Sequence, residues 1–373
     1  MSRSVMKIAL IGAGGITRAH LPGLVSLGEV RVFSVEGAAE LAAEWNLEVL
    51  PSYEEALAWA DVVDICTPTH THFELARQAL EAGVDVICEK PLCRTSADAQ
   101  TLVDIAASSG RVLLPAHVVR FFPAYVALHD AVQAGGIGEL AVLRFARSGT
   151  YPAWSTWFGN EEHSGGLVMD LMIHDLDQAR WLAGPVTSVF ATQVETRAGG
   201  DNGAGGDGGG DADSASASSS DSAVPAASRI AGCHCILTHA SGAISYIRGV
   251  WGAQSTVFET SFHVAGDGGY LEYESRDDYL IRTNGLDVSK RSIVPASNAD
   301  DPYGNELREF VAHIEGRTTA RVSALDGVMA VRLAEAALES IRTGKAVAFD
   351  EGAGGASACG EGVVCGCAKE DVK

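Results

Sequence analysis

The chain has 373 residues, a length that suggests two domains. Hydrophobic residues make up 47% of it and charged residues 20%, proportions that are ordinary for a globular protein and exclude a wholly disordered chain. The formal net charge is −21, and such an acidic surface repels phosphate backbones and anionic lipids. We therefore expect neither a nucleic acid nor a membrane as a partner.

The composition also indicates a compartment. No run of about 18 apolar residues is present, and residues 1–7 lack the apolar core of a signal peptide, so we expect a cytoplasmic protein. Its eight cysteines are then expected to be free thiols. Cys233 and Cys235 are interpreted as small core residues on one strand. No metal site is predicted, although three tail cysteines offer soft ligands: Cys359, Cys365 and Cys367.

In the first third of the chain, short apolar segments alternate with helical ones. Five segments are expected as strands: 5–11, 30–35, 62–66, 84–88 and 112–114. Five are expected as helices: 15–27, 38–45, 53–59, 73–82 and 97–108. Strands that alternate with helices predict βαβ units, and therefore a doubly wound parallel sheet of the Rossmann type over residues 1–120.

The pattern changes over residues 121–349. Six longer strands are expected: 140–147, 186–194, 230–238, 243–251, 256–265 and 269–274. Four helices are expected: 124–134, 167–182, 305–315 and 324–343. Consecutive strands predict an α+β domain with a largely antiparallel open sheet. Residues 199–227 and 350–373 are rich in glycine and poor in large apolar residues, so we expect a flexible insertion and a disordered tail.

A glycine-rich turn joins the first strand to the first helix. It reads Gly12-Ala-Gly14-Gly15-Ile16, with Thr17 at the place of a third glycine. Such glycines let the backbone approach a pyrophosphate, and the helix N-terminus supplies free N–H donors. We predict that Gly12, Gly14, Gly15 and Ile16 bind a dinucleotide; the alternative is a glycine-rich turn without a ligand.

Glu36 follows the second strand, about twenty residues after the glycines. A carboxylate there accepts hydrogen bonds from ribose hydroxyls and repels a 2′-phosphate, which favours NAD over NADP. Two alternatives stay open, because the register at this strand end is uncertain by two residues. Ser34 could occupy this position instead, or Glu36 could be a solvated surface acid.

Two further loops follow strands of the same sheet. Thr67, Pro68 and His72 come after the third buried strand, and we predict that they line the cofactor site. His70 and His72 together are poor evidence for a metal because no third ligand lies nearby. Glu89 and Lys90 follow the next strand and are also predicted to bind the cofactor, and the Lys90 ammonium can stabilise a developing alkoxide. A surface lysine before a proline is the commoner interpretation.

Asp170 and His174 lie four residues apart in an apolar helical segment, so they are expected to share one helix face. The carboxylate can orient the imidazole, and histidine suits proton transfer at neutral pH. The alternative is a buried structural pair. A loop before this helix carries aromatic residues suited to stacking on sugars, to a subunit contact or to a core: Tyr151, Trp154, Trp157 and Phe158.

These motifs taken together resemble the Gfo/Idh/MocA oxidoreductase family. The resemblance rests on segments spread from residue 5 to residue 349: Gly12–Thr17, Thr67–His72, Glu89-Lys90-Pro91, His117–Pro123, Gly165–Asp175, 265–272, Glu306–Phe310 and 336–344. It implies a pyridine-nucleotide enzyme in which Lys90, Asp170 and His174 are catalytic and His174 accepts the proton. We also predict substrate contacts from a larger set: His117, Arg120, Trp154, Trp157, Asp170 and His174.

From the resemblance we expect an NAD-dependent dehydrogenase that moves a hydride between the nicotinamide and a hydroxyl carbon of a sugar, cyclitol or glycoside. The rival functions are NAD-dependent redox-assisted glycosidic cleavage and a non-enzymatic nucleotide-sensing regulator. The joint presence of Lys90, Asp170 and His174 argues against the regulator. A broad open sheet needs covering, so we expect a homodimer or homotetramer.

Overall fold

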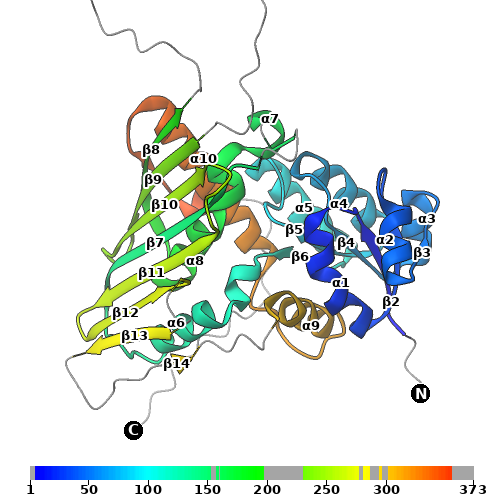
Figure 1. The fold of residues 1–373 in the computed structure, drawn as a ribbon, viewed down its shortest axis with the longest axis horizontal. Coiled ribbons are helices and arrows are strands. Elements are labelled where there is room, and N and C mark those ends of the chain that lie inside the picture. Colours follow the sequence, from blue (N-terminus) through cyan, green and yellow to red (C-terminus); the bar gives the residue numbers. More distant parts are fainter. Residues whose placement is uncertain are drawn as a thin grey trace, which may run out of the picture.

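The computed structural model describes residues 5–152, 157–158, 160–196, 230–276, 280–285, 294–295 and 301–354. Two sheets form two lobes, with α8 and α10 lying on the nine-stranded sheet and α9 beside the smaller one (Figure 1). The expected insertion at 199–227, the tail beyond residue 354 and Trp154 lie outside the described residues. No helix in the described part of the chain is long and apolar enough to cross a membrane.

The first sheet has six parallel strands in the order β3-β2-β1-β4-β5-β6. Its strands are β1 (Lys7–Ile11), β2 (Glu29–Phe33), β3 (Glu48–Val49), β4 (Val62–Ile65), β5 (Asp85–Glu89) and β6 (Leu113–Ala116). The helices between them are α1 (Gly15–Leu27), α2 (Ala38–Trp45), α3 (Tyr53–Trp59), α4 (His72–Glu81) and α5 (Ser96–Ser109). The strand order reverses between β1 and β4, and this is where a doubly wound sheet binds its ligand.

The second sheet has nine strands in the order β14-β13-β12-β11-β7-β10-β9-β8-β15. They are β7 (Leu140–Thr150), β8 (Val186–Thr196), β9 (Ile230–His239), β10 (Ile244–Gly252), β11 (Glu259–Gly266), β12 (Gly269–Glu274), β13 (Leu280–Gly285), β14 (Val294–Pro295) and β15 (Val347–Ala348). Only the described pair β7 and β10 is parallel; the other neighbours are antiparallel.

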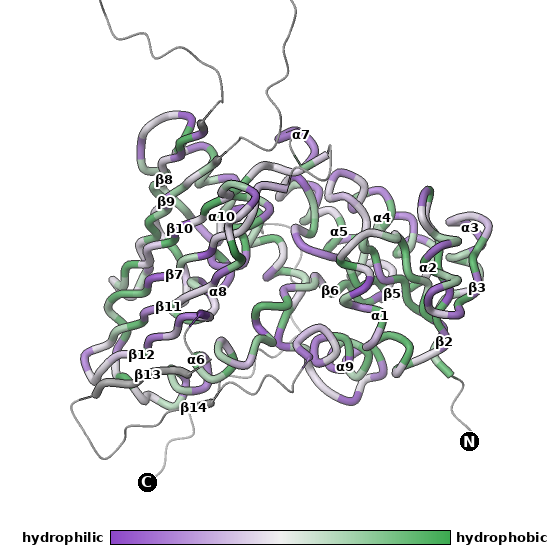
Figure 2. The backbone as a smooth tube through the Cα atoms, in the orientation of Figure 1, coloured by the Kyte–Doolittle hydropathy of each residue, from purple (hydrophilic) through white to green (hydrophobic). Residues whose placement is uncertain are grey.

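Helices from the second half of the chain pack against elements of both lobes. They are α6 (Pro123–Gln133), α7 (Glu161–Ser164), α8 (Ile173–Ala183), α9 (Pro302–Ile314) and α10 (Ala324–Thr343). Helix α9 packs on α1 and buries Leu307 and Phe310 in a core with Leu21 and Leu24. Figure 2 shows hydrophobic stretches in both lobes, in line with separate apolar cores beside each sheet. A helix from the late part of the chain thus packs against the lobe of the first sheet.

The predicted fold class is confirmed. Most strand and helix ends fall within three residues of their expected positions; four strands were not predicted: β3, β13, β14 and β15. Three of these have two residues each, which is too short for a hydrophobic period to be visible. The helix expected at 167–182 begins with a π-helical turn, Val168–Met172, before α8.

Candidate active site

The glycine turn shapes an open helix N-terminus. Gly12 has φ +115°, and a Cβ there would lie 2.6 Å from the carbonyl oxygen of Cys66, so only glycine fits without strain. A Cβ at Gly14 or Gly15 would meet nothing within 4 Å, which leaves space above the turn. Helix α1 has no side-chain cap and no acidic residue in its first turn. Free N–H donors facing open space suit a pyrophosphate.

A cleft of about 1200 Å³ begins at this turn. Its walls come mainly from the ends of β1, β2 and β4: Ile11, Gly12, Ala13, Gly14, Gly15, Ile16, Phe33, Ser34, Val35, Glu36, Gly37, Cys66, Thr67, Pro68, His70, Thr71, Glu74, Leu75, Trp157 and Phe158. Both candidates for the ribose position, Ser34 and Glu36, therefore line it. The predicted Thr67 and Pro68 line it too, and the residues present fit an extended dinucleotide.

His72 lies behind the cleft wall and does not line it. Its Nδ1 is 2.9 Å from the carbonyl oxygen of Pro91, and its Nε2 is 2.9 Å from that of Thr67. Burial lowers the pKa of this imidazole, although both carbonyl contacts oppose the shift. His72 therefore joins the Thr67 loop to the loop that carries Lys90, which is a positioning role rather than contact with the cofactor.

Lys90 reaches from the first sheet to the second half of the chain. Its Nζ donates to the backbone carbonyl of Asp170 at 2.8 Å and to Asp170 Oδ1 at 3.2 Å. Both side chains are 17% exposed, so the pair is largely but not fully withdrawn from solvent. Two of the three residues predicted to be catalytic are thus in direct contact across the two lobes.

His174 lies near this pair but has a different electrostatic setting. Burial and the nearby cations Lys90 and Arg147 hold the pKa of His174 well below its usual value. Its Nδ1 is buried without a hydrogen-bond partner among the described residues. The expected Asp170–His174 hydrogen bond is absent from the described part of the chain, because Asp170 pairs with Lys90.

Arg147 and Asp175 form a buried ion pair that sequence reasoning missed. Arg147 Nε and Nη2 donate to Asp175 Oδ2 and Oδ1 at 3.0 and 2.8 Å, a bidentate arrangement that joins β7 to α8 beside His174. Asp175 stood in the motif that suggested the site, but Arg147 was seen only as the end of a strand. The sequence did contain a sign of this pair: Arg147 is a charged residue on the core-facing side of a strand with alternating pattern, which predicts a buried ionic partner.

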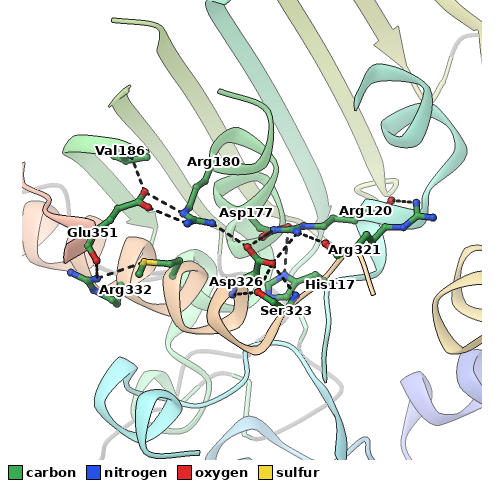
Figure 3. A network of polar contacts seen from close by, with 11 residues as sticks. His117, Arg120, Asp177, Arg180, Val186, Arg321, Ser323, Asp326, Arg332 and Glu351 are labelled. Atoms are coloured by element: carbon green, nitrogen blue, oxygen red, sulfur yellow. Dashed lines mark hydrogen bonds and ion pairs between the residues drawn. The ribbon is translucent and has the colours of Figure 1, made fainter. Parts of the chain in front are cut away.

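Two residues expected to bind substrate, His117 and Arg120, are both buried, in or beside a network of polar contacts (Figure 3). The Arg120 guanidinium binds both carboxylate oxygens of Asp177, at 2.8 and 2.6 Å, and also contacts Asp326. Its remaining nitrogen donates to the carbonyl oxygen of Arg321. Because every guanidinium nitrogen is engaged, Arg120 has a structural role here, in place of the expected substrate contact.

His117 lies on the margin of the same network. Its Nδ1 is 3.8 Å from Asp177 Oδ2, and both ring nitrogens are buried without a hydrogen-bond partner among the described residues. Burial lowers the pKa of this imidazole. A neutral ring with two open nitrogens keeps the capacity to bind a polar group, so His117 stays a predicted substrate contact.

Residues from the second half cover one side of the cofactor cleft. Trp157 and Phe158 stack on one another at 3.8 Å between ring centroids and line the cleft, so Trp157 lies against the cofactor side. Nearby, the rings of His70 and His163 stack at 4.4 Å. Arg94 fixes α7 by donating to the carbonyl oxygens of Glu161 and Glu162. Trp157 thus lines the cofactor cleft, and its sugar contact stays a prediction.

Two family models match the chain. Residues 6–117 match an oxidoreductase family with an NAD-binding Rossmann fold, and residues 125–272 match the GFO/IDH/MocA C-terminal domain. An inositol 2-dehydrogenase of Rhizobium meliloti (strain 1021) is 28% identical over 349 residues, which are 90% of this chain and 97% of that one. A D-glucoside 3-dehydrogenase of Escherichia coli (strain K12) is 32% identical over 196 residues, which are 49% of this chain and 56% of that one.

The fold also matches solved structures. Levoglucosan dehydrogenase in complex with NADH and levoglucosan superimposes with a TM-score of 0.76 at 20% identity, over 92% of this chain and 99% of that one. At this identity the likeness concerns the fold. The two family models together cover more than half of the chain. The protein therefore belongs to the GFO/IDH/MocA family and is an NAD-binding oxidoreductase.

Proposed function

We propose that this protein is a dehydrogenase that oxidises one hydroxyl carbon of a sugar, cyclitol or glycoside, with Lys90, Asp170 and His174 at the reacting centre. The observation that carries the proposal is the contact of Lys90 with Asp170 at the carboxyl edge of the Rossmann sheet, beside the neutral His174. The names of the relatives, inositol 2-dehydrogenase and D-glucoside 3-dehydrogenase, support a polyhydroxylated substrate. We propose residues 1–120 as the cofactor part and 121–349 as the substrate part.

NAD, when bound, supplies the acceptor for the hydride. Gly12, Gly14 and Gly15 would hold its pyrophosphate, and Glu36 would hold the adenosine ribose. Oxidation of an alcohol also releases the hydroxyl proton, which needs a base. His174 is neutral at pH 7 because its pKa is depressed, and a neutral imidazole can accept that proton. Lys90 stabilises the negative charge that develops on the hydroxyl oxygen.

Asp170 has a different part from the one its spacing suggested. Its carboxylate and carbonyl oxygens hold the Lys90 ammonium, which otherwise has four rotatable bonds of freedom. Fixing that ammonium before substrate arrives lowers the entropy cost of aligning the reacting oxygen. His117 lies near enough to lower the pKa of His174 and is proposed as a further substrate contact.

The test is a screen for NADH formation. Myo-inositol, D-glucose, methyl α-D-glucoside, levoglucosan and UDP-N-acetylglucosamine would each be incubated with the full chain and NAD, and NADH absorbance followed. Oxidation of at least one of them that is lost in Lys90→Met supports the proposal. Activity on an alcohol that Lys90→Met and His174→Gln both leave intact contradicts it.

We also infer a homodimer or homotetramer, formed through the face of the nine-stranded sheet that α8 and α10 leave uncovered. One cross-strand row on this sheet runs through paired residues: Phe190, Ile236, Tyr246, Arg144, His263 and Glu272. Phe190 and Tyr246 are 38% and 41% exposed, which is unusual for large apolar side chains in mid-strand. Light scattering after size exclusion that gives only monomer would overturn this inference.

We place the enzyme in the cytoplasm. The five described cysteines are free thiols, which is consistent with a reducing compartment: Cys66, Cys88, Cys93, Cys233 and Cys235. Cys233 and Cys235 are buried in the core of the second lobe, as expected. A separation of cell fractions that recovers the protein outside the cytoplasm would contradict this placement.

A further inference from the structure

A histidine outside the proposed site is buried among acidic groups beside the carboxyl ends of β4 and β5. His20 lies on α1 and is fully buried. Its Nδ1 is 2.8 Å from Asp64 Oδ2 on β4, and its Nε2 is 3.1 Å from Glu89 Oε1 at the end of β5. One imidazole therefore joins a helix to two neighbouring strands of the parallel sheet.

The partners of His20 determine its charge. An ionised carboxylate only accepts hydrogen bonds, so both ring nitrogens must donate and the ring must be an imidazolium. Burial alone would lower the pKa of His20, but contacts with Cys66 and Asp64 outweigh it and raise the pKa well above its usual value. The hydrogen bond from His20 in turn lowers the pKa of Glu89 against the effect of burial.

Glu89 carries this arrangement to the proposed site. Its second oxygen, Oε2, accepts the backbone N–H of Lys90 at 3.0 Å. The Lys90 side chain then extends to Asp170. An unbroken chain of hydrogen bonds thus runs from Asp64 through His20 and Glu89 to the backbone of Lys90.

A third acid closes the cluster from α9. Glu306 is fully buried, and neither carboxylate oxygen has a hydrogen-bond partner in the described structure. Burial raises the pKa of Glu306 well above its usual value; His20 opposes this shift, and Glu89 and Asp64 reinforce it. Glu306 is therefore neutral, and the cluster holds two carboxylates against one cation. The ring of Tyr303 covers His20 at 5.8 Å.

We propose that His20 is a positioning residue for Lys90, acting through Glu89. As the only cation between two buried carboxylates in the described cluster, it keeps Glu89 ionised and turned toward the Lys90 backbone. The inference rests on the proposed function of Lys90, because a lysine without a catalytic part would not need such support.

A metal is the competing explanation. The ligand atoms of His20, Asp64 and Cys66 lie within 4.8 Å of one another. However, 2.8 Å between His20 Nδ1 and Asp64 Oδ2 is a hydrogen-bond distance, which places a proton between these atoms. We therefore favour the proton over a metal.

The decisive variants form a double-mutant cycle. His20→Gln removes the cation, and Glu89→Gln removes its acceptor charge. In the double variant, the amide introduced at position 20 can donate a hydrogen bond to Asp64. It can also accept one from the amide introduced at position 89. The oxygen of this second amide accepts the Lys90 N–H, so the hydrogen-bond chain is complete again without the charges. His239→Gln is the matched control, since His239 is equally buried and bonds Gly184 and Ser245 in the other lobe.

Each variant would be assayed with NAD and the best alcohol from the NADH screen. We expect His20→Gln to lower kcat by about tenfold or more, while the Kd for NAD changes less than about threefold. The double variant should have a kcat about tenfold higher than that of the less active single variant. His239→Gln should stay within about twofold of the parent. Additive losses in the cycle, or an equal loss in His239→Gln, overturn the proposal.

A measurement on the parent protein covers the case in which His20→Gln does not fold. With ¹⁵N-labelled histidine, the His20 ring should show two protonated nitrogens at pH 7.5 by NMR, while His239 shows one. A neutral His20 ring, or stoichiometric zinc in the purified protein by mass spectrometry, overturns the proposal. Full activity of Lys90→Met would instead overturn the proposed function, so the two failures are distinguishable.

Discussion

The Lys90 ammonium binds two oxygens of one residue, the carbonyl oxygen of Asp170 at 2.8 Å and Asp170 Oδ1 at 3.2 Å. One contact depends on the Asp170 side chain, and the other does not. The backbone contact therefore keeps part of the lysine's placement when the carboxylate is changed. This division makes the contributions of charge and geometry separable by substitution.

Lys90→Met should abolish most of the turnover, because the variant keeps an unbranched apolar stem as far as Cε and loses the cation at Nζ. We expect kcat to fall by about a hundredfold or more, since a positioned acid–base group contributes about 10²–10⁴-fold. Asp170→Asn should cost less, because the carbonyl contact at 2.8 Å remains. Steady-state kinetics, with the Kd for NAD measured by calorimetry, compares the two. A larger loss in Asp170→Asn than in Lys90→Met would show that the carboxylate acts directly on substrate.

His174 should determine how activity depends on pH. Its pKa is lowered well below 6.5, so the imidazole stays neutral through pH 7 and becomes protonated only in more acidic solution. The acidic limb of kcat/KM is therefore expected below pH 6.5, with a plateau from there through pH 7.5. His174→Gln should remove this limb and lower kcat by about a hundredfold. A variant that binds NAD and keeps the parent's limb would exclude His174 as the base.

Glu36 should set the cofactor preference. It lines the cleft next to Ser34 and Val35, beyond the end of β2. A 2′-phosphate there would face a carboxylate, so the parent should prefer NAD by about tenfold or more, which corresponds to about 1.4 kcal/mol. Glu36→Gln should narrow the preference chiefly by improving NADP binding. Calorimetric Kd values for both cofactors test this, with Ser34→Ala as the comparison. A change in preference in Ser34→Ala alone would assign the ribose contact to Ser34.

The sequence was sufficient for the fold because the βαβ alternation and the long strands leave strong periodic signals. It also indicated the glycine turn, whose geometry depends on local residues such as Gly12 at φ +115°. It could not indicate the partner of Asp170, because the Lys90 ammonium that binds it lies 80 residues away in the sequence, on the first sheet. The role of Arg120 could not be predicted either, because its partners Asp177 and Asp326 are distant in the sequence. An arginine in a motif does not show whether it will bind substrate or buried carboxylates.

The hairpin between β8 and β9 offers a test of the long insertion. Thr196 and Ile230 are paired partners at its open end, so the two strands are already adjacent where residues 197–229 join them. Long loops add little closure entropy, about 0.6 kcal/mol per doubling of length, so shortening this one should not destabilise the sheet. In the test variant, Gly-Asn-Gly replaces residues 199–227. We expect its Tm to lie within about 2 °C of the parent's Tm and its kcat within about twofold of the parent's kcat. Calorimetry and the NADH assay measure both quantities. A folded variant with a large loss of turnover would mean that the insertion takes part in substrate binding, and a large drop in Tm would mean that it supports the sheet.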